Sequence, residues 1–402
     1  MESDGVETKL TTEKQSKLWL ILLIIGSVSL LASVAFILVT LLRPVEELEA
    51  IVFPELPTPQ GDTGAQKYYS TLTGLEISDP SLNSSPVFCM QTPNGLDGAR
   101  PQAGINEAAV VFEAIAEAGI TRFAAIYQNP TSSVIGPVRS LRMYYLDWDT
   151  PFDCTITHAG GAYDALVAVA QGGYKDLTEN YAYMYRGTIG SRLWNNLFTT
   201  STYLNQFAND YGYTTSNPKG FLRLTPSQAK NNRIKDLARN KLSILTATKT
   251  STNNLTPKVS NISINYGGWS NFNPVYHYNE TTNSYDRSYE SGEPHEVYNC
   301  PSGDQGEKNP ESICELKQLS PSVVIVMSVY ETLASDNYHE AITTVGSGTA
   351  HIFQNGTVIK GTWSKESKWE QIKFYDEAGQ EIALVPGQTW ISAVPHYGGV
   401  SY

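Results

Sequence analysis

An uncharged and mostly apolar run from Leu18 to Leu42 is the feature that most limits what this chain can fold into. As a helix, its 25 residues would extend for roughly 37 Å, which is more than the hydrocarbon core of about 30 Å in a typical bilayer. The few Ser and Gly residues in the run are compatible with a membrane helix, because a helix satisfies its own backbone hydrogen bonds. We therefore expect a transmembrane helix at 18–42.

Basic residues are distributed unevenly on the two sides of this run. Lys9, Lys14 and Lys17 precede it, whereas Arg43 is the one basic residue close behind it. Because Lys and Arg are enriched on the cytoplasmic side, we expect a cytoplasmic tail at 1–17 and a large extracytoplasmic part in a single-pass cell-membrane protein. A cleavable signal peptide is the alternative, but its apolar stretch is usually only about 7 to 15 residues. The run therefore favours a retained signal anchor.

The rest of the sequence divides into a linker and two folded regions. Residues 43–66 are rich in proline and predict an extended linker. Strand-like and helix-like runs alternate over 67–218, which predicts an α/β domain with a mixed sheet. A connecting helix and linker follow at 219–258, with Thr225 as the expected N-cap and Gln228 at the capping-box position. Short strand-like runs between turn signals predict a mostly antiparallel β domain over 259–402.

Several elements of the α/β region can be predicted individually. The apolar runs Ala108–Ala116 and Ile120–Gln128 are separated by a short turn and predict a hairpin. The spacing over Val138–Asp147 and over Tyr163–Ala170 is that of helices. A short strand at Cys154–His158 is expected to lead into the second of these helices.

All four cysteines fall on the expected outer side of the membrane, where disulfide bonds persist. Cys300 and Cys314 flank a polar loop, and we expect them to form a disulfide that contributes on the order of 3 kcal/mol. Cys89 and Cys154 form either the second pair or two buried thiols. No spacing of Cys and His indicates zinc, so no metal or cofactor is expected.

Arginine predominates over lysine in one part of the chain. Between Arg100 and Arg192 there are six Arg and one Lys, whereas the rest of the chain has five Arg and sixteen Lys. Arg presents a rigid fork that binds carboxylate or phosphate through two hydrogen bonds and tolerates burial. Because Arg122, Arg139 and Arg142 lie beside turns, we expect their loops to converge on an anion-binding cleft. The alternative is that each Arg pairs with a carboxylate of the chain itself.

The turn from His158 to Gly161 joins an expected strand to an expected helix. Such a turn exposes backbone N–H groups beside a helix N-terminus, which predicts anion-binding donors at Gly160 and Gly161. Imidazole titrates near neutral pH, so His158 is also a candidate general acid or base, with Glu113 or Asp164 as its carboxylate partner. A structural His in an ordinary strand-to-helix turn is the alternative.

Several blocks of the sequence are similar to a known bacterial family. They are RPQAGINEAAVVFEAIAEAGITRFAAIYQ, IGPVRSLRMYYLDW, ITHAGGAYDAL, the shorter NNLFTTS, VYHYNETTNSYDRSYESGEPH, VGSGTAHIFQNGTVIKGTWSK and LVPGQTWISAVP. In these blocks the chain resembles the DUF3048 (YerB-like) family, whose members are mostly predicted lipoproteins of the cell envelope. The resemblance implies an N-terminal and a C-terminal DUF3048 domain and an envelope location, but it implies no reaction.

Two differences from the family pattern bear on function. Family members commonly carry a lipid-modified cysteine, whereas this chain has the apolar run and no Cys before Cys89. Many members read PHNLYTS where this chain reads LWNNLFTTS, so that Asn195 stands in place of a His. The residues that fall in matched blocks and that we carry forward are Arg122, Arg139, Arg142, His158 and Asn196.

The sequence thus favours a membrane-tethered envelope protein whose first domain binds an anionic ligand through four arginines and the His158–Gly161 turn. The four arginines are Arg122, Arg139, Arg142 and Arg192. Wall polymers that carry carboxylate or phosphate groups are the expected ligands, and the β domain is expected to present the site or to recruit an envelope protein. The formal charge of −12 argues against nucleic acid as a partner. Two alternatives stay open: a cell-wall hydrolase or lyase that uses His158 and a carboxylate, and a scaffold without a ligand site. The sequence does not decide whether the protein is an enzyme.

Overall fold

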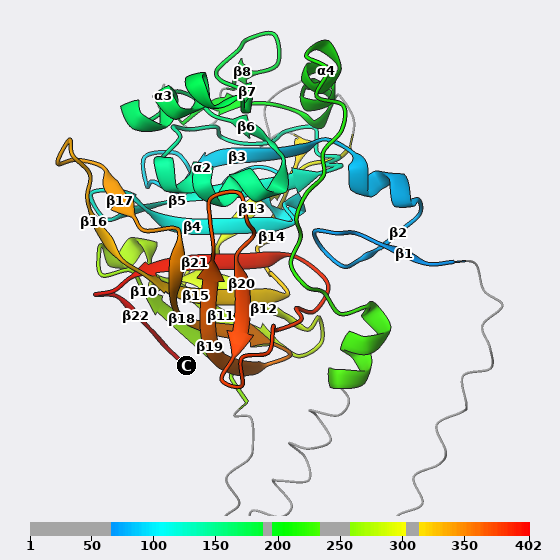
Figure 1. Ribbon diagram of the computed structural model, residues 1–402, viewed down its shortest axis with the longest axis vertical. Helices are drawn as coiled ribbons and strands as arrows, with labels where there is room; N and C mark the ends of the chain where they lie inside the picture. The colour runs from blue at the N-terminus through cyan, green and yellow to red at the C-terminus, as the bar shows by residue number, and fades with distance from the viewer. Residues whose placement is uncertain (1–65, 188–194, 234–257, 303–312) are drawn as a thin grey trace, which may run out of the picture. The chain divides into compact units, whose positions relative to one another are not determined.

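Ten strands from both halves of the chain form one continuous sheet (Figure 1). The structure is a computed structural model that describes residues 66–187, 195–233, 258–302 and 313–402. In sheet order, the strands are β20 (Lys373–Asp376), β19 (Thr357–Lys365), β18 (Gly346–Gln354), β15 (Val323–Val329), β21 (Thr389–Pro395), β4 (Val110–Glu117), β5 (Ile120–Gln128), β3 (Val87–Pro93), β6 (Thr155–Thr157) and β7 (Lys175–Leu177).

The two halves of the chain join at β21. This strand lies between β15 and β4 and runs parallel to both, with Ile391 opposite Ile325 on one side and Phe112 on the other. The sheet is therefore mixed, as expected, and the C-terminal strands are antiparallel except at β21. The regions 67–218 and 259–402 contribute to this one sheet, and their boundary as separate domains stays a prediction.

Both faces of the long sheet are buried, which explains why its central strands are almost continuously apolar. Along β4, Val110, Phe112 and Ala114 pack into one core, whereas Val111 and Ile115 pack into the other. The first core also contains apolar side chains of helices α2 (Met143–Asp149) and α3 (Tyr163–Gly172), and the second contains those of α4 (Ser201–Asp210). Hydrophobic burial on both faces thus stabilises the framework of the sheet.

A smaller antiparallel sheet closes the second core. Its strands, in sheet order, are β12 (Ser284–Tyr289), β11 (Pro274–Asn279), β10 (Asn261–Asn265) and β22 (Gly399–Ser401). Short two-stranded pairs surround these sheets: β1 (Tyr68–Tyr69) with β2 (Glu76–Ile77), β8 (Tyr185–Arg186) with β9 (Leu197–Phe198), β13 (Glu296–Asn299) with β14 (Glu315–Gln318), and β16 (Glu331–Leu333) with β17 (Glu340–Ile342). The 3-10 turns are η1 (Pro80–Ser84), η2 (Ile105–Glu107), η3 (Thr150–Phe152) and η4 (Ser270–Phe272).

The local predictions are confirmed except at one helix. β4 and β5 form the expected hairpin, and the helix after Thr225 has the expected capping box, in which the Thr225 N–H donates to Gln228 Oε1 at 2.8 Å. The helix expected over Val138–Asp147 begins only at Met143. Residues 138–141 are extended instead, because their main-chain groups bond to neighbouring elements and not to one another.

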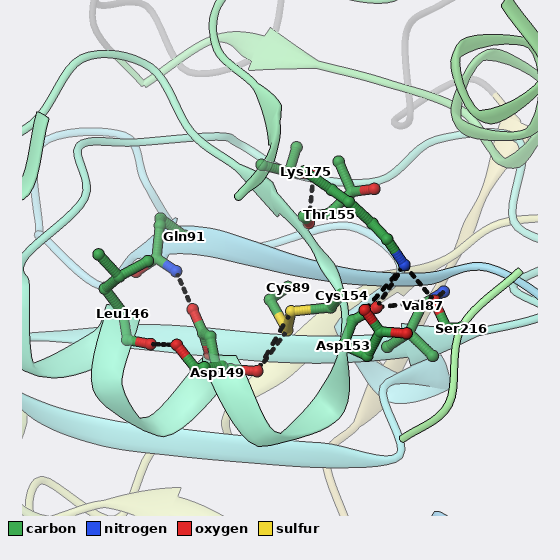
Figure 2. The surroundings of a disulfide bond; sticks show 12 residues. Val87, Cys89, Gln91, Leu146, Asp149, Asp153, Cys154, Thr155, Lys175 and Ser216 are labelled. Atoms are coloured by element: carbon green, nitrogen blue, oxygen red, sulfur yellow. Dashed lines mark hydrogen bonds and ion pairs between the residues drawn. A yellow bond between two sulfur atoms is a disulfide. The ribbon is translucent and has the colours of Figure 1, made fainter. Parts of the chain in front are cut away.

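Two disulfides are present. Cys300–Cys314 confirms the expected pair, and Cys89–Cys154 is the second, so these two side chains are not free thiols. Figure 2 shows that Cys89–Cys154 joins β3 to the start of β6, next to Asp149, whose carboxylate accepts from Gln91 Nε2 at 2.9 Å. This bond ties together two strands of the long sheet that are 65 residues apart in sequence.

Part of the expected organisation lies outside the described residues. This applies to the tail at 1–17, the transmembrane segment at 18–42, nearly all of the linker at 43–66, and residues 234–257 of the connecting segment at 219–258. Within the described part of the chain, no helix combines the length and the apolar character that a membrane span requires.

Candidate functional site

A cleft of about 510 Å³ lies beside the turn of the β4–β5 hairpin, and we call it the junction cleft because both halves of the chain line it. The N-terminal half contributes Pro93, Asn94, Gly95, Leu96, Asp97, Glu117, Ala118, Ile120, Thr121, Arg122, Arg139 and Asn195. The C-terminal half contributes Trp269, Asn271 and Phe272 from η4 and the residue before it.

Glu117 binds two of the expected arginines at once. It ends β4, and its carboxylate accepts from Arg122 Nη2 at 2.7 Å and from Arg142 Nη2 at 2.5 Å. Arg122 comes from the neighbouring strand β5, and Arg142 is the N-cap residue of α2. Arg122 and Arg142 are each 4% exposed. One carboxylate therefore faces two buried positive charges.

The pKa values in this cluster follow from burial and charge. Burial acts to raise the pKa of Glu117, but Arg122 and Arg142 outweigh it and lower the pKa overall. Burial and the charge of Arg142 lower the pKa of Arg122 from the high value of a free guanidinium. Glu117 is therefore ionised at neutral pH, and it compensates only one of the two positive charges.

Arg139 adds a third guanidinium group, which lines the cleft. Its backbone is fixed, because its N–H donates to Gln91 O at 2.7 Å and its carbonyl accepts from Ala159 N at 3.0 Å. Its side chain is half-buried and, among the residues that the structure describes, has no hydrogen-bond or ion-pair partner. Burial lowers the pKa of Arg139, while the charges of Glu117 and Asp97 act in the opposite direction. Arg139 is thus a positioned cation without a bound counter-charge in the described part of the chain.

Asn195 contributes an acceptor to the same cleft. The side chain is 2% exposed, and its Nδ2 donates to Asp97 Oδ1 at 2.8 Å. Its Oδ1 is buried and has no partner within the described residues. A buried acceptor without a donor costs free energy unless a bound molecule or water supplies one.

Trp269 forms the exposed wall of the cleft. Its side chain is 67% exposed, but its Nε1 donates to Ala118 O at 3.0 Å, so the indole is held against the β4–β5 turn. This close packing requires Gly119, whose φ is +75° and where an added Cβ would lie 2.9 Å from Trp269 Cδ1. The indole is therefore both exposed and fixed in place.

The candidate carboxylate Glu113 lies behind the cleft and does not line it. It is fully buried, and Arg287 Nη2 donates to both of its oxygens at 3.0 Å. It also accepts from Trp390 Nε1 and from Thr121 Oγ1, each at 2.9 Å. Glu113 is thus the anion of a buried ion pair that connects β4 to β12.

His158 and Asp164 are also not brought together with Glu113. His158 is 1% exposed; its Nε2 bonds to Asp176 Oδ1 at 2.9 Å and its Nδ1 to Gly160 O at 2.7 Å. Asp164 accepts from Ala165 N at 2.8 Å at the start of α3. Neither expected carboxylate is a partner of His158, because Asp176 of the neighbouring strand β7 occupies that position.

The His158–Gly161 turn supports the cleft from behind. The backbone N–H of Ala159 bonds to Arg139 O, Leu141 N donates to Gly160 O, and Gly161 pairs with Leu141. Gly160 and Gly161 therefore hold the segment that carries Arg139, and they are not among the residues that line the cleft. Within the described ranges, no three His, Cys, Asp or Glu side chains cluster as metal ligands.

The remaining expected residues lie elsewhere. Asn196 accepts from Arg186 Nη1 at 3.0 Å and donates to Gly187 O, outside the cleft lining. Arg192 lies outside the described residues. The residues that sequence reasoning missed are Asp97, Glu117, Asn195 and Trp269. Of these, Asn195 had a signal, since it replaces a His of the family pattern, and an exposed Trp269 after two glycines offered a weaker one.

Comparison with known proteins agrees with the quoted sequence blocks. Residues 72–214 match the family model described as "Protein of unknown function (DUF3048) N-terminal domain", and residues 262–391 match the corresponding C-terminal domain model. The chain is 27% identical over 349 residues to "Putative lipoprotein YerB" of Bacillus subtilis (strain 168), which covers 84% of this chain and 89% of that protein. The crystal structure of the YerB protein from Bacillus subtilis has a TM-score of 0.64 at 22% identity, covering 84% of this chain and all of that one. This structural likeness supports the fold.

Proposed function

The chain belongs to the DUF3048 family of proteins of unknown function, and from this premise we propose that it binds an anionic ligand of the cell envelope in the junction cleft. The observation that carries the proposal is the Arg139 guanidinium, which has no partner among the described residues and lines a cleft where Arg122 and Arg142 already share one carboxylate. A guanidinium on a fixed backbone that lines a cleft is suited to bind a carboxylate or a phosphate through two hydrogen bonds.

The charges around the cleft leave a surplus of one. The lining contributes two positive charges, from Arg122 and Arg139, and two negative ones, from Glu117 and Asp97; Arg142, which bonds to Glu117 from outside the lining, adds a third positive charge, so 3 − 2 = +1. The whole chain has a formal charge of −12, so a positive cleft is a local feature and not a consequence of composition. An anion that enters the cleft would neutralise the surplus.

Two arguments support an envelope location. The apolar segment 18–42 is long enough to span a bilayer, and the asymmetry of basic residues favours a cytoplasmic N-terminus. The relative in Bacillus subtilis carries the name of a lipoprotein, which is a membrane-anchored type of protein. A signal anchor in this chain would give the same result as a lipid in the relative, namely a folded body tethered outside the membrane.

Arg139→Gln tests the proposal, with Lys317→Gln as the matched control. Lys317 lies in β14, is exposed and does not line the cleft, so both variants lose one positive charge. Because a charge-assisted hydrogen bond contributes about 1.5–3 kcal/mol, Arg139→Gln should weaken the binding of the full-length protein to isolated cell-wall material by roughly 10- to 100-fold. Lys317→Gln should leave the affinity within about twofold.

Arg142 is a poorer choice for this test, because its loss would leave Glu117 with one cation and alter the cleft itself. The measurement is a cosedimentation isotherm at fixed ionic strength, with folding of each variant checked by thermal unfolding. Equal affinities of Arg139→Gln and the unmodified protein would contradict the proposed function.

A further inference from the structure

We propose that the ligand of the junction cleft is a carboxylated amino sugar, whose carboxylate binds Arg139 and whose pyranose ring stacks on Trp269. This inference rests on the proposed function and adds the chemical class of the ligand. It depends on three features of the same cleft: an exposed and fixed aromatic face, and a cation and a buried acceptor that both have no partner within residues 66–187, 195–233, 258–302 and 313–402.

The aromatic face is the first argument for a ring. An indole that is 67% exposed loses little freedom on binding, because its Nε1–H···O bond to Ala118 already fixes it. Leu96 and Ile120 extend the apolar part of the lining, and Leu96 is 62% exposed. A simple anion such as phosphate would use none of this surface, whereas the C–H face of a pyranose would cover it.

The buried acceptor is the argument for an amino sugar. Asn195 lines the cleft, its buried Oδ1 has no donor in the part of the chain that the structure describes, and a carboxylate cannot supply one. An acetamido N–H or a sugar hydroxyl can. The carboxylates of Asp97 and Glu117 would accept from further hydroxyl groups, which explains why a cleft for an anion also contains acidic residues. A ligand with one carboxylate, one N–H donor and several hydroxyls satisfies this set.

The size of the cleft sets the length of the ligand that it encloses. Its volume of about 510 Å³ falls in the range of about 300–1,000 Å³ that is typical of small-molecule sites. One or two sugar rings fill such a volume. Any longer polymer would therefore bind through a single residue or a disaccharide and would extend into solvent on either side.

Three probes separate the contribution of the charge from that of the sugar ring with its acetamido group. N-acetylmuramic acid has a pyranose ring, an acetamido N–H and a carboxylate; N-acetylglucosamine lacks the carboxylate; glycerol phosphate has the charge but no ring. Ligand-observed NMR titration of the full-length protein, purified in detergent because of the segment 18–42, gives the three dissociation constants. We expect N-acetylmuramic acid to bind at least about tenfold more tightly than either of the other probes.

Trp269→Ala should weaken the binding of N-acetylmuramic acid by roughly 5- to 20-fold and leave glycerol phosphate unchanged. Trp269→Phe retains a ring and should lose no more than about threefold, which separates stacking from the bond to Ala118. Trp369→Ala is the control, because Trp369 is also exposed, at 52%, and does not line the cleft.

The outcomes distinguish the two proposals. In one outcome, N-acetylmuramic acid and glycerol phosphate bind equally tightly, Arg139→Gln weakens the binding of both, and Trp269→Ala weakens the binding of neither. This outcome would overturn the amino-sugar inference and leave the anion site intact. Binding of N-acetylglucosamine as tight as that of N-acetylmuramic acid would overturn the contact between Arg139 and the sugar carboxylate, and with it the amino-sugar inference. Failure of N-acetylmuramic acid to bind the unmodified protein would overturn this inference.

Discussion

Replacing Glu117 by Gln should destabilise the folded protein. The same replacement should increase the stabilisation that a bound anion gives. The substitution keeps the shape of the side chain but removes the charge that Arg122 and Arg142 share. Both guanidinium groups would remain buried, at 4% exposure, and would repel each other. The wild-type arrangement is stable because one carboxylate lies between them.

The magnitude follows from burial. Removing one partner from a buried ion pair costs about 3–5 kcal/mol, since a charge is left without compensation. Glu117 itself is 16% exposed, so water can partly compensate and we expect a loss of about 3 kcal/mol at pH 7. Glu76→Gln is the control: its partner Lys67 and Glu76 are 56% and 52% exposed, and such a surface pair contributes about 0–1 kcal/mol.

The loss should also depend on pH in a defined direction. Because the pKa of Glu117 is lowered in the folded protein, its contribution to stability is present above the unfolded-state pKa of about 4.3 and disappears as the pH falls through the folded-state value. The difference in the free energy of unfolding between wild type and Glu117→Gln should therefore shrink as the pH is lowered from 5 toward 3. Equilibrium urea unfolding of the full-length proteins at several pH values gives this difference.

Phosphate supplies the second readout. In Glu117→Gln the charge surplus of the cleft rises by one, so a bound anion should stabilise this variant more than wild type. At a phosphate concentration 100-fold above its Kd, the gain is about 2.7 kcal/mol. Phosphate and chloride are compared at equal ionic strength. Two results would refute the view of Glu117 as the shared counter-ion of an anion site. One is a free energy of unfolding of Glu117→Gln equal to that of Glu76→Gln, and the other is equal stabilisation of Glu117→Gln and wild type by phosphate.

Three further predictions concern the framework behind the cleft. Arg287→Met should lower the free energy of unfolding by about 3–5 kcal/mol, because it leaves the buried carboxylate of Glu113 without its ion-pair partner. In urea unfolding, the double variant with Glu113→Leu should be more stable than Arg287→Met alone. Replacing both Cys89 and Cys154 by Ala should cost about 4 kcal/mol, as expected for a loop of 65 residues, and this is measured by thermal unfolding under oxidising conditions. Burial raises the pKa of Glu331 to about 7. The contribution of Glu331 to the stability of the folded protein is therefore most favourable below the unfolded-state pKa and is lost as the pH rises to 7. Glu331→Gln should be more stable than wild type by about 3 kcal/mol above pH 7, and its stability should no longer depend on pH in this way.

Local patterns predicted the hairpin, the helix after the glycine pair and the capping box at Thr225, because each depends on residues close together in sequence. The start of α2 was predicted too early. The apolar spacing over Val138–Asp147 is compatible with a helix, but the N–H groups of Val138 and Arg139 bond to Leu197 and Gln91, which are distant in sequence. Hydrogen bonds of this kind cannot be inferred from periodicity.

The residues that line the cleft were also predicted only in part. The preference for Arg over Lys located Arg122 and Arg139 in the cleft and Arg142 beside it. It did not identify Trp269, which lies in the C-terminal half of the chain and meets the β4–β5 turn through its bond to Ala118 O. The turn at Gly160 was correctly located, but its Ala159 N–H donates to Arg139 O and its Gly160 carbonyl accepts from Leu141 N, so its role is to position the segment that carries Arg139.

The most direct test of an anion site at Arg139 is the NMR signal of its own side chain. In full-length protein labelled with ¹⁵N-arginine, the Nε signal of Arg139 is assigned by its loss in Arg139→Gln, and acetate and phosphate are titrated separately at constant ionic strength. We predict a saturable shift at Arg139 and none at Arg223, whose Nη1 already donates to Val385 O at 3.0 Å. An Arg139 signal that stays unchanged, or that drifts in parallel with Arg223 without saturation, would contradict the account.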